Sequence, residues 1–177
     1  MLTPSVEAIS IKANSHTYTV NFVESAEVTL SQTIRDGDFL FIDNHVAQLF
    51  PSLPLLSDDA HTIRINASED QKKFENLAPI LHQLIANGIK RENRLVAVGG
   101  GITQDITAFI ASILFRGIDW SFLPTTLLSQ ADSCIGSKTS INLGNYKNQL
   151  GGFHPPIEIF IDLKFLSSLQ HKEILSG

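Results

Sequence analysis

The sequence has little cysteine and few charged residues. Its 177 residues include one cysteine, Cys134, and only 18% are Asp, Glu, Lys or Arg. A single cysteine excludes an internal disulfide framework. The formal net charge is -5 and no run of Lys or Arg occurs, so the clustered cations that a nucleic-acid or anionic-membrane partner requires are absent. We therefore predict a protein that binds neither nucleic acid nor membranes.

The sequence also lacks the patterns of a secreted or membrane protein. Its first residues, MLTPSVEAIS, have neither the basic start nor the apolar core of a signal peptide. The segment 95–115 has about the length of a transmembrane helix, but Gln104 and Asp105 lie in its middle, where polar groups are expensive. We interpret it as a strand followed by a helix, and we predict a cytoplasmic protein.

What the sequence does contain is an alternation of strand and helix patterns. Hydrophobic residues make up 43% of the chain, enough for one compact core, and no linker or repeat divides residues 1–177. Residues 7–22 alternate apolar and polar side chains around Asn14 and Ser15, which predicts a β-hairpin. Short apolar runs follow: DFLFID, HTIRINA, RLVAVGG, WSFLPTT and IEIFIDL. Their order predicts an α/β fold with a mainly parallel sheet and flanking helices.

The clearest helical pattern follows Ser68. Apolar residues recur at three- and four-residue steps from Phe74 to Ile85, and Gly88 is placed to end the helix. The apolar face of this helix is expected to pack on the sheet.

Three consecutive glycines, Gly99 to Gly101, separate the run LVAV from a helical pattern. Unpaired backbone N–H groups and the positive end of the helix dipole meet at such a turn, which favours a phosphate group. The usual dinucleotide motif needs a further glycine at position 104, where Gln104 stands. By itself the turn is equally compatible with a purely structural role, and Asp105 with a favourable interaction with the helix dipole.

Polar residues are concentrated in the segment 124–156, PTTLLSQADSCIGSKTSINLGNYKNQLGGFHPP. Such convergence is typical of a site rather than a core. The sequence GSKT resembles the end of a nucleotide-binding P-loop, but that motif requires a glycine where Ala131 stands, which excludes it. We interpret His154 as a loop residue and Cys134 as a packed, unreactive thiol, because neither has a partner at metal or catalytic spacing.

Together the motifs GGGITQD, FRG, PTTLLSQADS, GSKT, YKNQLGGFHPP and FIDLKFLSSL resemble the N-terminal half of 3-dehydroquinate synthase and the related sugar-phosphate cyclases. The resemblance is clearest over residues 38–177 and implies a Rossmann-like NAD-binding domain that spans the chain. It places fifteen residues around NAD: Asp43, Glu69, Lys72, Gly100, Gly101, Asp105, Thr125, Thr126, Leu128, Lys138, Lys147, Phe165, Leu166, Ser167 and Ser168.

The same resemblance implies a substrate site. Asp132, Lys138 and Asn148 match catalytic residues that contact the substrate hydroxyls. Arg116 matches an arginine that reaches the substrate phosphate of a neighbouring subunit, which implies a homodimer. The implied reaction is the NAD-dependent cyclisation of a seven-carbon sugar phosphate with loss of phosphate, as in 3-dehydroquinate synthase, a lyase of the shikimate pathway that supplies aromatic amino acids.

The chain departs from the family pattern at several positions. Ser68, Gln104 and Tyr146 stand where the family often has glycine. The zinc or cobalt ligands of the family follow Gly177 and lie in a helical second domain, so the resemblance implies no metal ligand in this chain and no activity of the chain alone. Three alternatives stay open: a cyclase for another substrate such as sedoheptulose 7-phosphate, a non-catalytic NAD-binding protein, and a metal-dependent alcohol or glycerol dehydrogenase.

Overall fold

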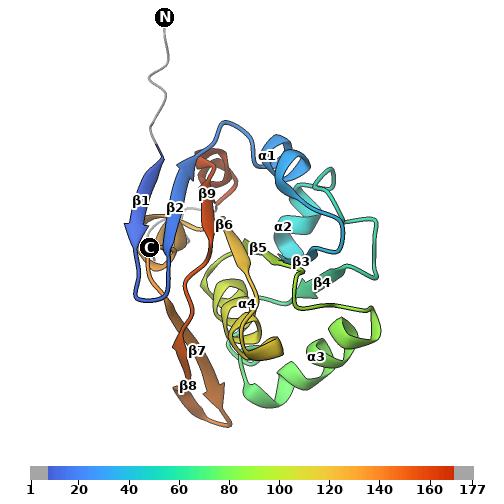
Figure 1. Cartoon of the computed structure of the whole chain (residues 1–177). Helices are drawn as coiled ribbons and strands as arrows, with labels where there is room; N and C mark the ends of the chain where they lie inside the picture. The colour runs from blue at the N-terminus through green and yellow to red at the C-terminus, as the bar shows by residue number, and fades with distance from the viewer. Residues whose placement is uncertain (1–7, 170–177) are drawn as a thin grey trace, which may run out of the picture.

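A seven-stranded sheet forms the centre of the molecule (Figure 1). The computed structural model describes residues 8–169. The strands stand in the order β1-β2-β9-β6-β5-β3-β4, and their bounds are β1 Ile9–Lys12, β2 Thr17–Phe22, β3 Phe39–Asp43, β4 Thr62–Ile65, β5 Leu95–Gly99, β6 Trp120–Pro124 and β9 Glu158–Ile161. All neighbouring pairs are parallel except β1 with β2. The predicted mainly parallel sheet is confirmed.

Helices cover both faces of this sheet. The α-helices are α1 Ala26–Thr33, α2 Asn44–Leu49, α3 Leu77–Ala86 and α4 Gly101–Ile113, and the shorter helical segments are η1 Phe74–Asn76, η2 Leu114–Arg116, η3 Ser129–Ser133 and η4 Leu163–Ser168. Within residues 8–169, none is long and apolar enough to cross a membrane.

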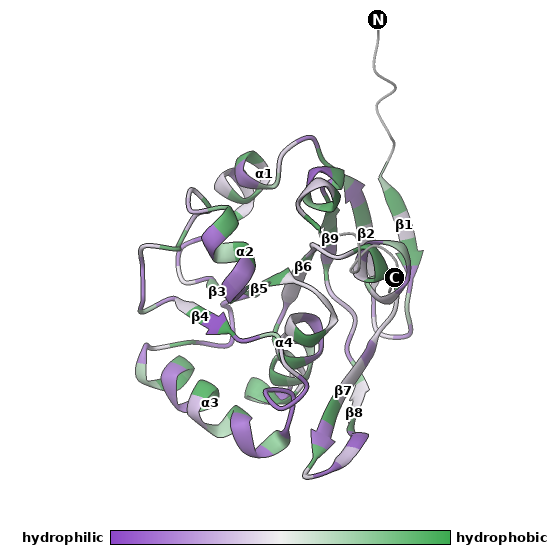
Figure 2. Ribbon diagram, turned by 180° about the vertical axis from the view of Figure 1, so that it is seen from behind, coloured by the Kyte–Doolittle hydropathy of each residue, from purple (hydrophilic) through white to green (hydrophobic). Residues whose placement is uncertain are grey.

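Each central strand contributes to two hydrophobic cores, because its side chains alternate between the faces of the sheet. Phe39 and Phe41 of β3 pack with α3 and α4, whereas Leu40 and Ile42 pack with α1 and α2. Figure 2 shows green, apolar segments running through the sheet strands, with purple segments on the outer parts of the helices. Burial on both faces explains why these strands appear in the sequence as continuous apolar runs.

Two local predictions are confirmed. The N-terminal hairpin forms by antiparallel pairing of β1 with β2, with Lys12 opposite Thr17. The helical pattern after Ser68 becomes η1 followed by α3, and α3 ends just before Gly88, which has a φ of 77°. A positive φ costs glycine no steric energy, so this residue ends the helix as expected.

The chain order places a crevice between β3 and β5. The strand that follows β3 in the sequence, β4, lies on one side of this pair, and the strand that follows β5, β6, lies on the other. In open parallel sheets, ligands bind at such a switch point, outside the carboxyl ends of the strands. Asp43 and the glycine turn 99–101 lie at these ends.

A two-stranded ribbon extends from the body of the molecule beside α4 (Figure 1). It consists of β7, Lys138–Leu143, and β8, Tyr146–Phe153, paired antiparallel. The sequence did not predict this ribbon, because nearly all of β8 is exposed and therefore shows no apolar alternation.

Candidate functional site

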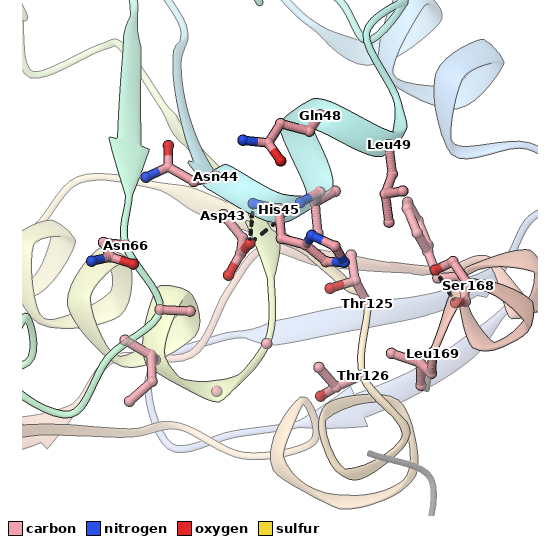
Figure 3. Close-up of a pocket in the computed structure, with 16 residues that line it drawn as sticks. Asp43, Asn44, His45, Gln48, Leu49, Asn66, Thr125, Thr126, Ser168 and Leu169 are labelled. Carbon is pink, nitrogen blue, oxygen red and sulfur yellow. Dashed lines mark hydrogen bonds between the residues drawn. The ribbon is translucent and has the colours of Figure 1, made fainter. Parts of the chain in front are cut away.

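Two cavities meet at the glycine turn. The first has a volume of about 580 Å³ and lies outside the ends of β3, β5 and β6 (Figure 3). Its lining residues are Asp43, Asn44, His45, Val46, Gln48, Leu49, Asn66, Ala67, Gly100, Gly101, Ile102, Thr125, Thr126, Phe165, Ser168 and Leu169. Seven of the residues expected around NAD are therefore brought together: Asp43, Gly100, Gly101, Thr125, Thr126, Phe165 and Ser168.

Asp43 is held in place by the start of α2. Its Oδ1 accepts hydrogen bonds from the backbone N–H groups of His45 at 2.7 Å and Val46 at 3.3 Å, as a residue at a helix N-cap does. The other oxygen, Oδ2, has no hydrogen-bond partner among residues 8–169 and is free for a ligand hydroxyl.

On the opposite wall, η4 is positioned by Asp162. This buried carboxylate accepts from the N–H of Lys164 at 2.9 Å and from the N–H of Ala26 in α1 at 2.8 Å. These two bonds fix the direction in which η4 leaves β9. They thereby place Phe165 and Ser168 at the first cavity.

The three glycines of the turn differ in the space that surrounds them. A Cβ on Gly99 would lie 2.5 Å from Thr103 Oγ1, and one on Gly100 would lie 2.9 Å from Thr126 Cγ2, so both positions are too crowded for a side chain. A Cβ on Gly101 would meet nothing within 4 Å. Gly101 is the first residue of α4 and lines both cavities. The bare backbone at this helix N-terminus fits the close approach of a phosphate.

The second cavity lies between the first turn of α4, η3 and the β7–β8 ribbon, and its volume is about 680 Å³. Its lining residues are Lys72, Gly101, Gln104, Asp105, Asp132, Ser133, Ile135, Gly136, Ser137, Lys138, Ser140, Asn148 and Phe153. The three residues expected to contact the substrate hydroxyls, Asp132, Lys138 and Asn148, line this cavity. Lys72 and Asp105, expected around NAD, are there as well.

A buried ion pair lies on this wall. Lys72 Nζ is 2.6 Å from Asp105 Oδ2 and donates to Asn148 Oδ1 at 2.8 Å. Burial raises the pKa of the Asp105 carboxyl above its ordinary value, and the nearby Lys72 ammonium counters part of this effect. The lysine thus favours the charged form of a carboxyl group where water is partly excluded.

Replacing Lys72 with methionine is expected to raise the pKa of Asp105 further, because burial then acts without the ammonium. A carboxyl group whose pKa is higher in the folded than in the unfolded protein stabilises the fold at pH values below its ordinary pKa of 3.8. This stabilisation is lost as the pH rises through the folded-state pKa. The variant should therefore lose more unfolding free energy than the wild type as the pH rises through this range. Carboxyl NMR titration of Asp105 and urea unfolding at several pH values measure both effects; an unchanged Asp105 titration would contradict the assignment.

Several expected residues line neither cavity. Glu69, Leu128 and Lys147 are exposed, and Leu166 and Ser167 lie in η4 beside residues that do line the first cavity. Arg116 is exposed at the end of η2, with a φ of 66°, away from both linings. The roles of these residues stay predictions.

The two residues interpreted as structural behave accordingly. Burial raises the pKa of the Cys134 thiol to about 11, which keeps it protonated and unreactive. His154 Nε2 lies 2.8 Å from the carbonyl oxygen of Ile118, and Trp120 Nε1 donates to the carbonyl of His154 at 3.1 Å. This histidine anchors the chain that leads from the ribbon into β9.

Sequence reasoning missed the role of Gln104 in the second cavity. Its Nε2 donates to the carbonyl of Ser133 at 2.6 Å, and its Oε1 accepts from Ser133 Oγ at 2.9 Å. This reciprocal pair ties the first turn of α4 to η3, which carries Asp132. The presence of an amide in place of a small residue in the turn was a signal, but its partner lies 29 residues away.

A divalent metal has no ready site in the part of the chain that the structure describes. Over residues 8–169, no group of three or more His, Cys, Asp or Glu side chains gathers in a way that could hold a metal ion. The described residues therefore offer a cavity that fits NAD but no set of ligands that fits a metal ion.

The fold and the two cavities define an α/β domain with the architecture of a dinucleotide-binding domain. The family model for the N-terminal domain of 3-dehydroquinate synthase matches residues 62–176, and the chain belongs to this family. A 3-dehydroquinate synthase from Helicobacter pylori strain G27 is 35% identical over 173 residues, which cover 97% of this chain and 50% of that enzyme. The chain thus spans about half the length of this curated relative.

Solved structures of sugar-phosphate cyclases share this fold, and two of them contain bound NAD+. A 2-deoxy-scyllo-inosose synthase complexed with carbaglucose-6-phosphate, NAD+ and Co2+ has a TM-score of 0.78 and 26% identity, with 97% of this chain and 50% of that chain covered. The 2-epi-5-epi-valiolone synthase of Streptomyces hygroscopicus with NAD+ and Zn2+ bound has a TM-score of 0.77 and 28% identity, with 94% and 48% covered.

Proposed function

We propose that residues 1–177 form the NAD-binding domain of an enzyme that cyclises a seven-carbon sugar phosphate with loss of phosphate, as 3-dehydroquinate synthases do. The observation that carries this proposal is the position of Gly101. It lines both the cavity that fits a dinucleotide and the cavity that contains Asp132, Lys138 and Asn148. A cofactor bound over the turn would therefore reach a substrate held by these three side chains.

The first cavity has the parts that a dinucleotide requires. The free oxygen of Asp43 accepts from a ribose hydroxyl, and the N–H groups at the start of α4 face the pyrophosphate. Thr125 and Thr126 line the same cavity as the glycine turn. When bound, NAD supplies a hydride acceptor, while the protein supplies position and electrostatic field.

The second cavity has the parts that a phosphorylated sugar requires. Lys138 provides a positive charge, and Asp132 and Asn148 provide acceptors and donors for ring hydroxyls. Lys72 pairs with Asp105 on the wall of the second cavity, and the Asp105 carboxyl is placed to bind a ribose hydroxyl. These groups orient the reacting hydroxyl toward the cofactor, which contributes to the rate through proximity.

Two parts of the proposal concern groups outside the described cavities. The metal that such chemistry uses to polarise a hydroxyl is assigned to no residue of this chain. Arg116 is proposed to serve the substrate phosphate of a second copy in a homodimer. Its exposure away from both cavities supports this, because it reaches neither cavity of its own chain.

A cyclase for another sugar phosphate is the second candidate. It is favoured by Gln104, which occupies the wall of the second cavity and is bonded to Ser133, and by Tyr146 in the ribbon, both at positions where the family often has glycine. The likeness to cyclases of different names supports the class of reaction over one particular substrate.

Calorimetric titration tests the assignment of the two cavities. We expect the chain to bind NAD, and to bind a seven-carbon sugar phosphate in the presence of NAD. Lys138→Met should weaken sugar-phosphate binding about tenfold or more, because a charge-assisted contact is lost, and should weaken NAD binding less, because Lys138 lines only the second cavity. Lys90→Met removes the same charge from an exposed loop and is the matched control. A folded wild-type chain that binds no NAD at millimolar concentration would refute the proposed function.

A further inference from the structure

Asn142 is a buried polar residue that neither the motifs nor the proposed reaction assigns a role. It lies in β7 and is 3% exposed. The register of β7 with β8 shifts between Ile141 and Leu143, so Asn142 stands at an irregularity of the ladder. Such irregularities re-aim side chains and are common next to active sites.

The backbone of Asn142 joins the ribbon to another segment. Its N–H donates to the carbonyl oxygen of Lys72 at 3.0 Å, and Asn142 forms an isolated parallel bridge with Lys73. The ribbon is thereby attached to the loop that carries Lys72.

The side chain of Asn142 extends this attachment in two directions. Its Nδ2 donates to Glu69 Oε1 at 2.9 Å and to the Glu69 carbonyl at 3.3 Å, while its Oδ1 accepts from the N–H of Asn148 at 2.8 Å. One carboxamide thus connects Glu69, on the loop before Lys72, with Asn148, on the wall of the second cavity.

This support bears on Asn148, whose backbone has an uncommon conformation. It has a φ of 57°, the left-handed region, within the strand β8. Residues other than glycine adopt this conformation at a cost, and such strain persists where surrounding contacts hold it. In this conformation Asn148 Oδ1 accepts from Lys72 Nζ and from Ser140 Oγ, both at 2.8 Å.

We propose that Asn142 is a positioning residue that holds Asn148 in its left-handed conformation and keeps Glu69 and Lys72 in place, the latter on the wall of the second cavity. Asn142 does not line either cavity and acts through these neighbours. The proposal rests on the proposed function for its effect on ligands, but its structural part is testable without any ligand.

Two substitutions distinguish the hydrogen bond that the Asn142 side chain accepts from Asn148 from those that it donates to Glu69. Asn142→Leu keeps the approximate size and removes every side-chain hydrogen bond. Asn142→Asp keeps an acceptor for the N–H of Asn148 but places a carboxylate against Glu69. Asn145→Asp adds the same charge at the exposed end of the ribbon and is the matched control.

The first measurement is amide hydrogen exchange by NMR on the 177-residue chain without ligand. In Asn142→Leu, the Asn148 amide should exchange about tenfold faster or more, as expected for the loss of one partly buried hydrogen bond. The amide of Val98 in β5 should keep its protection and report an intact fold. In Asn142→Asp the Asn148 amide should remain protected. An unchanged exchange rate of the Asn148 amide in Asn142→Leu would overturn the proposal. If Asn142→Leu does not fold, rapid exchange of the Asn148 amide in Asn142→Asp would overturn the proposal instead.

The second measurement is the titration of Asp105, which a purely structural role for Asn142 would leave unchanged. Misplacement of Lys72 in Asn142→Leu should raise the pKa of Asp105, since the ammonium no longer offsets burial. NAD affinity should fall about tenfold in Asn142→Asp and remain at the wild-type value in Asn145→Asp. An equal loss in Asn145→Asp would assign the effect to added charge and overturn the proposal. A wild-type chain that binds no NAD refutes the proposed function instead, and the amide exchange then decides the role of Asn142.

Discussion

Replacing Gly101 with valine is expected to abolish NAD binding and leave the fold intact. The Cβ of residue 101 points into open space at the junction of the two cavities, so the added isopropyl group occupies the volume that the pyrophosphate needs. Loss of two charge-assisted backbone contacts corresponds to a decrease in affinity of about a hundredfold or more. Valine has a higher helix propensity than glycine, so α4 should form at least as readily.

Calorimetric titration with NAD measures this effect, and thermal unfolding verifies the fold. Gly152→Val is the matched control: a Cβ there also meets nothing within 4 Å, but Gly152 is exposed on the ribbon and lines neither cavity. NAD affinity in Gly101→Val equal to that of the wild type would show that the glycine turn serves structure only.

Replacing Arg94 with methionine is expected to cause the largest loss of stability. Arg94 is 2% exposed, and its guanidinium donates to Asp38 Oδ2 at 2.7 Å and to the carbonyl of Thr33 at 2.7 Å, with a further ion pair to Glu158. Asp38 is 3% exposed. Removing the cation leaves a buried carboxylate without its partner, which costs about 3–5 kcal/mol.

Urea unfolding of the variant measures this loss. A double variant, Arg94→Met with Asp38→Leu, should recover much of it, because replacing both partners of a buried pair by apolar residues is far less costly than removing one. A single variant as stable as the wild type would contradict this account. Residues 38, 94 and 158 lie at the amino ends of β3, β5 and β9, opposite the cavities, so NAD affinity should not change.

The central fold could be predicted because its local patterns agree with its tertiary contacts. The run LVAV is continuous and apolar because β5 is buried on both faces, and the glycines after it mark where the strand gives way to α4. The order of these runs was sufficient for a parallel sheet with covering helices. The β7–β8 ribbon was not predictable in this way, since β8 buries no face and has no period.

The site residues could be found in part. Asp132, Lys138 and Asn148 were located by motif, and the structure places all three on one cavity wall. Gln104 and Asn142 were not assigned a role. Their partners are distant in sequence: Ser133 for Gln104, and Glu69 for Asn142. A hydrogen bond between two segments that are distant in the sequence produces no periodic pattern of residues in either segment.

The sequence by itself determined the class of fold, the position of the glycine turn and the residues that match the cyclase motifs. These features depend on local preferences of the chain: burial of apolar runs, the freedom of glycine and the spacing of polar side chains. Only the tertiary structure decided that Gly101 borders both cavities, that Lys72 pairs with Asp105 and that Asn142 supports the left-handed Asn148. The physical reason is that these contacts join segments that are distant in the sequence and approach one another only when the sheet and its two hydrophobic cores have formed.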